Sequence, residues 1–323
     1  MRQQPFREIA RELTRRVREG IYAPDSALPP RLELMREFGV ARATLDRAIR
    51  ELMSDGVLIG RHGSGTYVNG SGVGRRRVAV IGGINPEEDM GTPFDLTVIP
   101  VSELKVKSAW KRLFDFDGLL WMRPEAELLP VIDAVGGQLP QVLVNRVHPG
   151  TAYVSTDHRG AYHAITKERL ALYPAAKVFF LRSALNSLAL DYRFDGFVDA
   201  CREQGRFYEL LHMPTEFEAK LALLHERIPV APGEMRILVA DARAHTGAVM
   251  RFERAACWKR ELLYSDFDND YGRDVWGVEV TSFLQEPSRL FREAAAKLGR
   301  MLEGGDDGEE GVLIAPERRD GDT

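Results

Sequence analysis

The stretch LPPRLELMREFGVARATLDRAIRELMSDGVLIGRHGSGTYV, residues 28–68, decides the fold of the first part of this 323-residue chain. Pro29-Pro30 ends any preceding helix, because proline lacks the backbone N–H that a helix interior needs. A helical apolar stripe follows, made of Leu32, Met35 and Phe38. Gly39 can then supply a tight turn, so the pattern predicts a short helix that ends at a corner.

A second helix and a hairpin follow that corner. The helix opens at 41–44 and ends at Asp55-Gly56. Its buried stripe is Leu45, Ala48, Ile49 and Leu52. Residues 57–59 and 66–68 are predicted strands around a glycine-rich turn, the wing. With a first helix over 7–19, these elements predict a winged helix-turn-helix, whose second helix fits the major groove of double-stranded DNA.

The distribution of charge supports that interpretation. The chain carries a net charge of -4, which alone would not favour a polyanionic partner. Residues 1–77, however, contain fifteen arginines and no lysine against nine acidic residues, a surplus of six positive charges, which leaves -10 for the remainder. Arginine-rich surfaces neutralise phosphate, so the basic end is the predicted DNA end.

Residues 28–68 closely resemble the DNA-binding domain of the GntR family of bacterial repressors. The family's pattern GVSRxTVRxAL stands here as GVARATLDRAI at 39–49, and its wing pattern GxGTxV stands as GSGTYV at 63–68. The resemblance implies that Arg42 and Thr44 contact DNA and that the wing tip lies in or over the minor groove. The full set of expected DNA contacts is Arg31, Ala41, Arg42, Ala43, Thr44, Arg47, Arg61, His62 and Gly63.

Two positions depart from the family pattern. Where the family has Ser-Glu-Arg after its Leu-Pro, this chain has Pro30-Arg31-Leu32, which displaces the arginine by one residue. Where the family has a second arginine, this chain has Asp46, whose carboxylate would repel a phosphate. Arg47 is adjacent but lies about 100° round the helix. These changes affect the expected operator and affinity more than the class of protein.

After residue 68 the composition and the hydrophobic pattern of the sequence change. A glycine-rich and basic linker, 69–77, precedes short aliphatic runs that alternate with amphipathic segments, as in a parallel α/β sheet. Predicted strands lie at 78–81, 96–100, 117–122, 141–144, 176–181, 208–213, 236–240 and 261–264. Predicted helices lie at 103–114, 125–135, 159–171, 190–204, 215–226, 243–255 and 286–303. We expect a winged domain over 1–68, an α/β domain over 78–316 and a C-terminal tail over 317–323, with residues 318–323 frayed.

Four motifs in the α/β part carry a second resemblance. They are FDGLL at 116–120, LPQVLVNR at 139–146, VSTDHRGA at 154–161 and YRFDGF at 192–197. In this order they resemble signatures of the LacI/GalR repressors, whose effector domain has the fold of periplasmic sugar-binding proteins. The whole chain looks like the arabinose-repressor type of GntR protein. The resemblance implies a winged helix-turn-helix followed by a two-lobed, periplasmic-binding-protein-like α/β domain that binds a small-molecule effector, a sugar or sugar derivative.

The same resemblance implies four ligand-binding residues, Asn145, Arg193, Asp241 and Asp268. Amide, carboxylate and guanidinium groups form paired hydrogen bonds with neighbouring hydroxyls, and parallel sheets present such groups at strand carboxyl ends. Structural roles remain open for each. Asp268 and Arg193 could form a salt bridge, Asn145 could be a turn residue, and Asp241 could cap the following helix.

One departure concerns the site itself. Only fourteen residues, 82–95, connect the first two strands, which is short for the crossover helix that the family has there. The pocket could therefore be remodelled, open or defunct. Four tryptophans, Trp110, Trp121, Trp258 and Trp276, could stack on a sugar or simply belong to the core.

Other classes of function find little support. No nucleophile, phosphate-loop or zinc-protease motif occurs, so we expect no enzyme, no cofactor and no metal. No run of eighteen apolar residues and no signal-peptide pattern occurs, which indicates a cytoplasmic protein with no membrane partner. Cys201 and Cys257 lack disulfide or metal spacing and are predicted to be buried; His245 is predicted to lie on the surface.

The sequence therefore predicts a transcriptional regulator, a repressor that binds a palindromic operator as a homodimer and responds to a carbohydrate-like effector. Two alternatives remain. The α/β domain could be a dimerisation platform that needs no ligand, or it could be an enzyme carrying a winged helix. The short first crossover favours the former, and the missing catalytic motifs argue against the latter.

Overall fold

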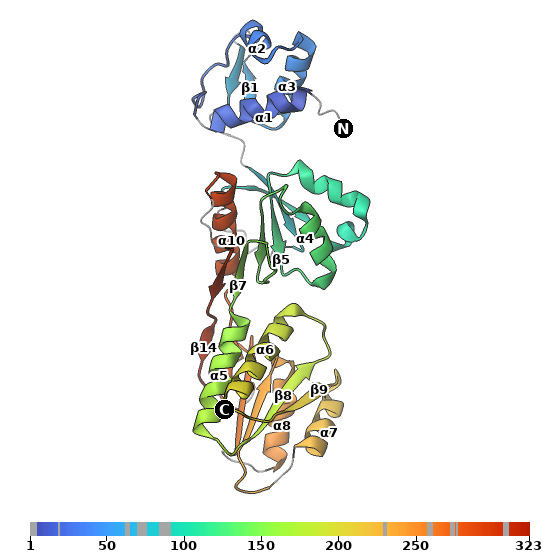
Figure 1. Ribbon diagram of the computed structural model, residues 1–323, viewed down its shortest axis with the longest axis vertical. Helices are drawn as coiled ribbons and strands as arrows, with labels where there is room; N and C mark the ends of the chain where they lie inside the picture. The colour runs from blue at the N-terminus through green and yellow to red at the C-terminus, as the bar shows by residue number, and fades with distance from the viewer. Residues whose placement is uncertain are drawn as a thin grey trace. The chain divides into compact units, whose positions relative to one another are not determined.

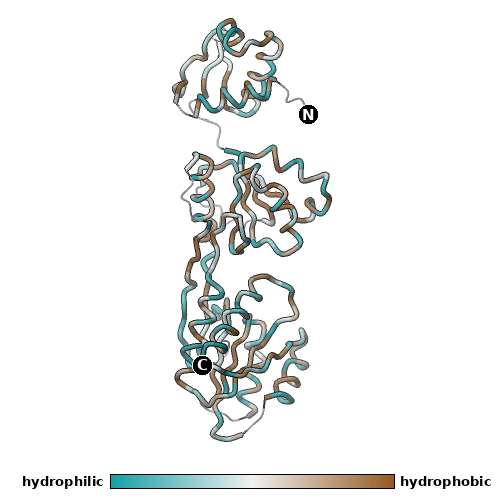
Figure 2. Tube along the Cα trace, in the orientation of Figure 1, coloured by the Kyte–Doolittle hydropathy of each residue, from teal (hydrophilic) through white to brown (hydrophobic). Residues whose placement is uncertain are grey.

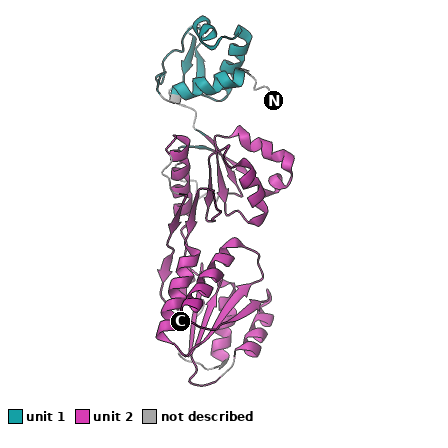
Figure 3. Ribbon diagram, viewed as in Figure 1, with its two compact units in different colours: residues 1–76, 93–95 teal, residues 77–92, 96–323 magenta. Residues whose placement is uncertain are grey.

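The computed structural model describes residues 5–18, 20–61, 65–69, 76–83, 92–228, 231–256, 261–271, 275, 277–305 and 310–323. Two compact units divide the chain, residues 1–76 with 93–95 and residues 77–92 with 96–323 (Figure 3). Each unit has its own hydrophobic core, and each is described by itself.

The first unit is a winged helix-turn-helix. Its elements are α1 (Pro5–Arg18), α2 (Arg31–Phe38), α3 (Arg42–Ser54), β1 (Leu58–Arg61) and β2 (Gly65–Val68). Gly39 has φ 63° and ends α2 in the left-handed conformation, which glycine adopts without strain. The strands pair antiparallel with Leu58 opposite Val68, and the predicted stripe of α3 is buried against α1. The predicted helix-turn-helix and hairpin are confirmed.

The core face of α2 differs from the prediction. Leu34 is the fully buried residue of this helix, and Met35 and Phe38 pack beside it. Leu32, which was expected in the stripe, is 58% exposed. Eight residues make barely two turns, so a three-residue pattern defines the buried face poorly.

The second unit contains two lobes, each built on a parallel sheet. In lobe 1 the strand order is β13-β7-β6-β5-β3-β4. Its strands are β3 (Arg77–Ile81), β4 (Asp95–Ile99), β5 (Gly118–Met122), β6 (Gln141–Val144), β7 (Tyr153–Thr156) and β13 (Gly311–Ile314). Helices α4 (Leu129–Val135) and α10 (Pro287–Leu302) belong to this lobe, and α10 packs on β5, β6 and β7 (Figure 1). Strands β5 and β6 are buried along their whole length, as strands covered on both faces are.

Lobe 2 has the strand order β14-β12-β11-β10-β8-β9. Its strands are β8 (Lys177–Ser183), β9 (Glu209–Met213), β10 (Arg236–Ala240), β11 (Leu262–Phe267), β12 (Thr281–Leu284) and β14 (Glu317–Arg319). Its helices are α5 (His158–Leu172), α6 (Leu188–Glu203), α7 (Phe217–Arg227) and α8 (Thr246–Ala256). Hydrophobic residues run along the strands of both lobes (Figure 2). Within the described residues, the chain passes between the lobes three times, from β7 to α5, from β12 to α10 and from β13 to β14.

A glycine sets the distance between α5 and α6. A Cβ atom added at Gly196 would lie 2.1 Å from the carbonyl oxygen of Arg159, so any larger residue would push the two helices apart. Asp157 caps α5 by accepting a hydrogen bond from the backbone N–H of Gly160 at 2.8 Å. Both residues lie in motifs that carried the second family resemblance. The motifs therefore mark backbone geometry as well as site residues.

Several elements of the structure differ from the prediction. The expected helix over 103–114 is instead two 3-10 helices, η1 (Val101–Lys105) and η2 (Lys107–Asp115), separated by the extended, β-branched Val106. Strands β7, β12 and β13 were not predicted. Residues 317–323 are not a frayed tail, because β14 pairs antiparallel with β12 and Thr323 accepts a hydrogen bond from Arg169 at 2.9 Å.

Candidate functional site

The exposed surface of α3 is the candidate nucleic-acid interface. Ala41 precedes the helix in an extended conformation, and Ala41, Arg42 and Ala43 are exposed while Thr44 is half-buried. The buried stripe on the opposite side fixes which face α3 presents to solvent. Its first turn is therefore free to approach base edges, as a recognition helix requires.

Arg31 connects three elements beside this surface. Its Nε donates to Oδ1 of Asp46 on α3 at 2.9 Å, and both terminal nitrogens lie 3.2 Å from Oγ1 of Thr66 on β2. Arg42 lies on the other side of Asp46, with its Nε 3.5 Å from Oδ2. The Asp46 carboxylate thus lies between two guanidinium groups. The sequence suggested that this carboxylate would repel phosphate, but in the structure Arg31 and Arg42 offset its charge.

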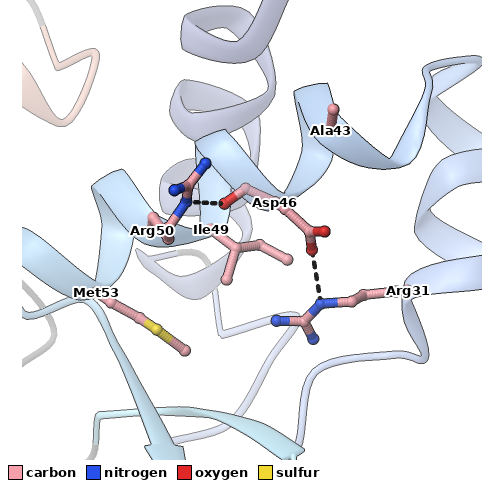
Figure 4. Close-up of a pocket in the computed structure, with 6 residues that line it drawn as sticks. All are labelled: Arg31, Ala43, Asp46, Ile49, Arg50 and Met53. Atoms are coloured by element: carbon pink, nitrogen blue, oxygen red, sulfur yellow. Dashed lines mark hydrogen bonds and ion pairs between the residues drawn. The ribbon is translucent and has the colours of Figure 1, made fainter.

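A hollow of about 490 Å³ lies beside α3. Figure 4 shows the residues that line it. Its lining residues are Arg31, Ala43, Asp46, Ile49, Arg50 and Met53. Arg50 donates from its Nε to the backbone carbonyl of Asp46 at 3.3 Å. The lining therefore holds two arginines and one carboxylate, which come from α3 and from the start of α2.

The remaining predicted DNA contacts occupy other positions. The guanidinium carbon of Arg47 lies 4.0 Å from the ring centre of Phe6 in α1, so this side chain covers the neighbouring helix instead of standing beside Asp46. Arg61 lies over Tyr67 at 4.5 Å and pairs with Asp25 at 3.3 Å. His62 and Gly63 fall outside the described residues. Contact of all nine residues with DNA stays a prediction.

In the two-lobed unit, a glutamine links two of the four predicted ligand residues. Asn145 follows β6 with φ 61° and donates from Nδ2 to Oε1 of Gln285 at 2.7 Å. The Nε2 of Gln285 donates to Oδ2 of Asp268 at 2.8 Å, and Asp268 follows β11 with φ 60°. Asn145 therefore reaches from the end of a lobe 1 strand to the segment that follows β12. Burial raises the pKa of Asp268, and the charge of Arg193 lowers it in part.

Arg193 on α6 lies against this network and is 4% exposed. Its guanidinium lies 3.6 Å from the ring centre of Phe267, donates to the backbone carbonyl of Asp241 at 2.6 Å, and is 3.9 Å from the Asp268 carboxylate. Its Nε donates to Nδ1 of His158 at 3.3 Å. Burial holds the pKa of His158 well below its ordinary value, and Arg193 and Arg146 lower it further, so the imidazole is neutral.

Asp241 has a structural environment. It is fully buried, and its carboxylate accepts from the backbone N–H and the hydroxyl of Ser183 at 2.7 and 2.6 Å. His245, predicted on the surface, is 2% exposed and lies 3.3 Å from the same carboxylate. That prediction was wrong because a buried carboxylate draws a polar partner inward. Asp241 joins the site through its backbone carbonyl, which Arg193 contacts.

A second set of polar contacts, which we call the seam, joins the two lobes at the start of α6. Glu125 of lobe 1 accepts hydrogen bonds from the Ser187 hydroxyl and the Leu188 N–H, both at 2.9 Å, and from Arg146. Tyr192 on α6 donates to the carbonyl of Val147 at 2.8 Å. A carboxylate at a helix N-terminus is stabilised by the free N–H groups there. The seam therefore holds in place the helix that carries Arg193.

Sequence reasoning missed Gln285, His158, Glu125 and Arg146. Gln285 follows a strand that was not recognised, and no local pattern reveals it. His158 follows the Asp157 cap, inside a motif already used for the family resemblance, so it could have been included. Glu125 and Arg146 are 21 residues apart, and their pairing depends on the fold.

The other candidates are placed as follows. Trp121 is buried and donates to Gln141 at 2.9 Å, and Trp110 donates to the Leu104 carbonyl, so both belong to lobe 1 packing. Trp258, Trp276 and Cys257 lie outside the described residues, whereas Cys201 is buried as predicted. The described part of the chain contains no group of three or more His, Cys, Asp or Glu arranged to hold a metal. None of its helices is long and apolar enough to cross a membrane.

Comparison with known sequences identifies the first unit. Residues 5–68 match the family described as bacterial regulatory proteins, gntR family. The histidine utilization repressor of Klebsiella aerogenes is 35% identical over 65 residues, 20% of this chain and 27% of the relative. The mannosyl-D-glycerate transport/metabolism system repressor of Escherichia coli is 40% identical over 63 residues, 20% and 26% of the two chains. The chain thus spans about a quarter of the length of these relatives.

Solved structures identify the fold of the second unit. A LacI-family regulatory protein from Chloroflexus aggregans has a TM-score of 0.59 at 15% identity, over 75% of this chain and 96% of its own. A structure described as the transcriptional regulator CelR in complex with cellobiose has a TM-score of 0.56 at 17% identity, over 87% and 90%. At such identities the likeness concerns the fold alone. The chain therefore carries a winged helix-turn-helix of the gntR family of bacterial regulatory proteins, followed by a two-lobed domain with the fold found in LacI-family regulators.

Proposed function

We propose that this protein is a transcriptional regulator that binds DNA through α3 and the wing and responds to a small carbohydrate or sugar derivative. The observation that carries the proposal is the presence, in one chain, of a gntR-type winged helix and a LacI-type two-lobed domain with a polar network at its strand ends. Relatives of the first unit are repressors by name, so repression is the proposed direction of control.

The chemistry of the network suits a polyhydroxylated ligand. Asn145, Gln285, Asp268 and Arg193 offer an amide, a second amide, a carboxylate and a guanidinium within one connected set of contacts. Such groups form paired hydrogen bonds with neighbouring hydroxyls. A solved neighbour contains cellobiose, and one curated relative is named for mannosyl-D-glycerate, which places carbohydrates first among the ligands to test.

A homodimer on a palindromic operator completes the proposal. One winged helix reads a single half-site, and two linked half-sites raise affinity without new contacts. A ligand that binds one arrangement of the two lobes better than the other would shift their equilibrium, and we propose that the 69–77 linker transmits this shift to the recognition helices. Most of that linker, 70–75, lies outside the described residues.

The test is a thermal-shift screen of the full-length protein with pentoses, hexoses, disaccharides, sugar acids and sugar phosphates. A ligand at a hundredfold excess over its Kd stabilises the folded state by about 2.7 kcal/mol, which a melting curve resolves. The sugar that shifts the curve is then added to a protein–operator complex, followed by fluorescence anisotropy. The proposal expects a melting shift together with a changed DNA affinity.

Two variants on α6 make the test specific. Arg193→Ala should abolish the melting shift and the ligand response while leaving DNA affinity without ligand unchanged. Arg202→Ala is the matched control, because this arginine is on the same helix and its side chain is 76% exposed. An Arg193→Ala protein that responds like wild type would contradict the proposed ligand site.

The internal pairing of the site favours a second candidate, a dimerisation platform that needs no ligand. Asn145 uses both amide atoms, on Gln285 and on the Thr156 N–H, and the Asp241 carboxylate is occupied by Ser183. If no sugar shifts the melting curve of a protein that melts cooperatively and binds its operator, this candidate replaces the sugar-responsive one.

A further inference from the structure

Three side chains on the exposed face of α3 alternate between positive and negative charge. Arg42, Asp46 and Arg50 lie four residues apart, which places them one above the other on a single face of the helix. The Asp46 side chain is 36% exposed and that of Arg42 is 75% exposed, so both can reach a partner in solution. Asp46 and Arg50 of this face also line the hollow (Figure 4).

The Asp46 carboxylate is held in a defined orientation. Arg31 binds its Oδ1 at 2.9 Å, and Arg31 is itself fixed to Thr66, which is 5% exposed on β2. A carboxylate tied to another helix and a strand loses little further freedom when it binds DNA. Preorganisation of this kind favours recognition over a freely rotating side chain.

The other carboxylate oxygen retains acceptor capacity. Oδ2 lies 3.5 Å from the Nε of Arg42, too far for a strong hydrogen bond. Each carboxylate oxygen can accept two hydrogen bonds, so Oδ2 can take a donor from DNA. The terminal nitrogens of Arg42 remain available on the same side of the helix.

A hollow lies beside the Asp46 side chain. Ala43, one turn before Asp46, has only a methyl group, and Ile49 and Met53 line the hollow with apolar atoms. Arg31 and Arg50 give the lining of the hollow more positive than negative charge, which attracts the phosphate backbone.

In the major groove, cytosine presents an exocyclic amine and its paired guanine presents two acceptors. We propose that Asp46 and Arg42 together read one C·G base pair in each half-site, with Asp46 accepting from the cytosine amine and Arg42 donating to guanine. Guanine or thymine opposite the carboxylate would place acceptor against acceptor. Adenine offers an amine, but its neighbouring N7 faces the same carboxylate. This specificity rests on the proposed DNA-binding function.

The experiment selects duplexes from a randomised library with full-length wild type, Asp46→Asn, Asp46→Ala and Asp55→Asn. Wild type should enrich cytosine at one position of each half-site by about 5- to 100-fold over the other bases. Asp46→Ala should lose that preference, and Asp46→Asn should change it to adenine, which asparagine reads through N6 and N7. Asp55→Asn, at the exposed end of α3, should keep the wild-type preference.

A DNA analogue provides a second test that does not depend on a new consensus. Replacing the selected cytosine by 2-pyrimidinone, which lacks the exocyclic amine, should weaken wild-type binding about tenfold. The same replacement should leave the affinity of Asp46→Ala unchanged, because both halves of the contact are then absent.

The outcomes separate this inference from the function on which it rests. A wild-type protein that enriches no sequence over random DNA would overturn the proposed function. Wild type that enriches an operator, together with an Asp46→Asn protein that enriches the same bases at every position, would overturn the reading of C·G and leave Asp46 only the role of holding Arg31.

Discussion

Removing the Glu125 carboxylate should destabilise the two-lobed unit more than removal of any exposed neighbour. Glu125 accepts from Arg146, from the Ser187 hydroxyl and from the Leu188 N–H, so Glu125→Ala breaks an ion pair and leaves the N-terminus of α6 without its partner. The effect should therefore include both lobes.

The magnitude follows from the burial of the partner. The Arg146 side chain is only 7% exposed, and its Nε already lacks a partner among the described residues. Breaking a buried ion pair costs about 3–5 kcal/mol, because the remaining charge stays away from water. The Glu125 side chain is 30% exposed, so water can replace part of its lost interaction with Arg146. The lower end of the range therefore applies, about 3 kcal/mol. At roughly 2–4 °C per kcal/mol, the melting temperature should fall by about 6–12 °C.

Scanning calorimetry and urea unfolding of wild type and three variants test this value. Glu127→Ala is the matched control, because Glu127 is two residues away and exposed. Glu125→Gln should lie between wild type and Glu125→Ala, since the amide oxygen still accepts from Leu188 but carries no charge. If Glu125→Ala loses no more stability than Glu127→Ala, the seam contributes nothing and the reasoning is refuted.

Three further predictions concern other regions. In anisotropy titrations, Arg42→Ala should weaken operator binding by about 1–3 kcal/mol and binding to random DNA much less. Equal losses of affinity for the two DNAs would make Arg42 a phosphate contact. His158 has a lowered pKa from burial, so the unfolded state takes up a proton near pH 6.5 that the folded state does not. The free energy of unfolding should therefore fall by up to about 1.4 kcal/mol per pH unit as the pH drops below 6.5. In urea titrations at several pH values, His158→Gln should remove this slope. The control His212→Gln, at an exposed position, should keep it. Deleting residues 317–323 should lower the free energy of unfolding by about 3 kcal/mol in the same assay, because it removes β14 and the carbonyl partner of the buried Arg169. An unchanged midpoint of urea unfolding would show that the segment does not contribute to stability.

Local spacing predicted those parts of the fold whose burial repeats along the chain. The stripe Leu45, Ala48, Ile49 and Leu52 keeps helical spacing over about two turns of α3 and was recognised. The all-apolar runs that became β5 and β6 were recognised because both faces of these strands are covered. Strand β12 has four residues and β14 has three, and each is stabilised by pairing with a distant segment that no local pattern can show.

The candidate site was predicted as residue types but not as contacts. Arg193 and Asp268 lie 3.9 Å apart, yet the connection from Asp268 to Asn145 runs through Gln285, which is 140 residues from Asn145. The charge of Asp46 looked unfavourable because its partner Arg31 is 15 residues away on another helix. Electrostatic arguments from sequence fail where the compensating charge is supplied by the fold.

The three passages of the chain between the lobes have a consequence for biosynthesis. Strand β13 completes the edge of the lobe 1 sheet and β14 completes the edge of the lobe 2 sheet, and both belong to the segment 311–319. Neither lobe is a continuous stretch of sequence, so neither can finish folding on the ribosome before that segment has emerged. The winged helix is complete by residue 68 and can fold while the rest is being made. A nascent chain stalled between these points would display a finished winged helix without the two-lobed domain that we propose controls it.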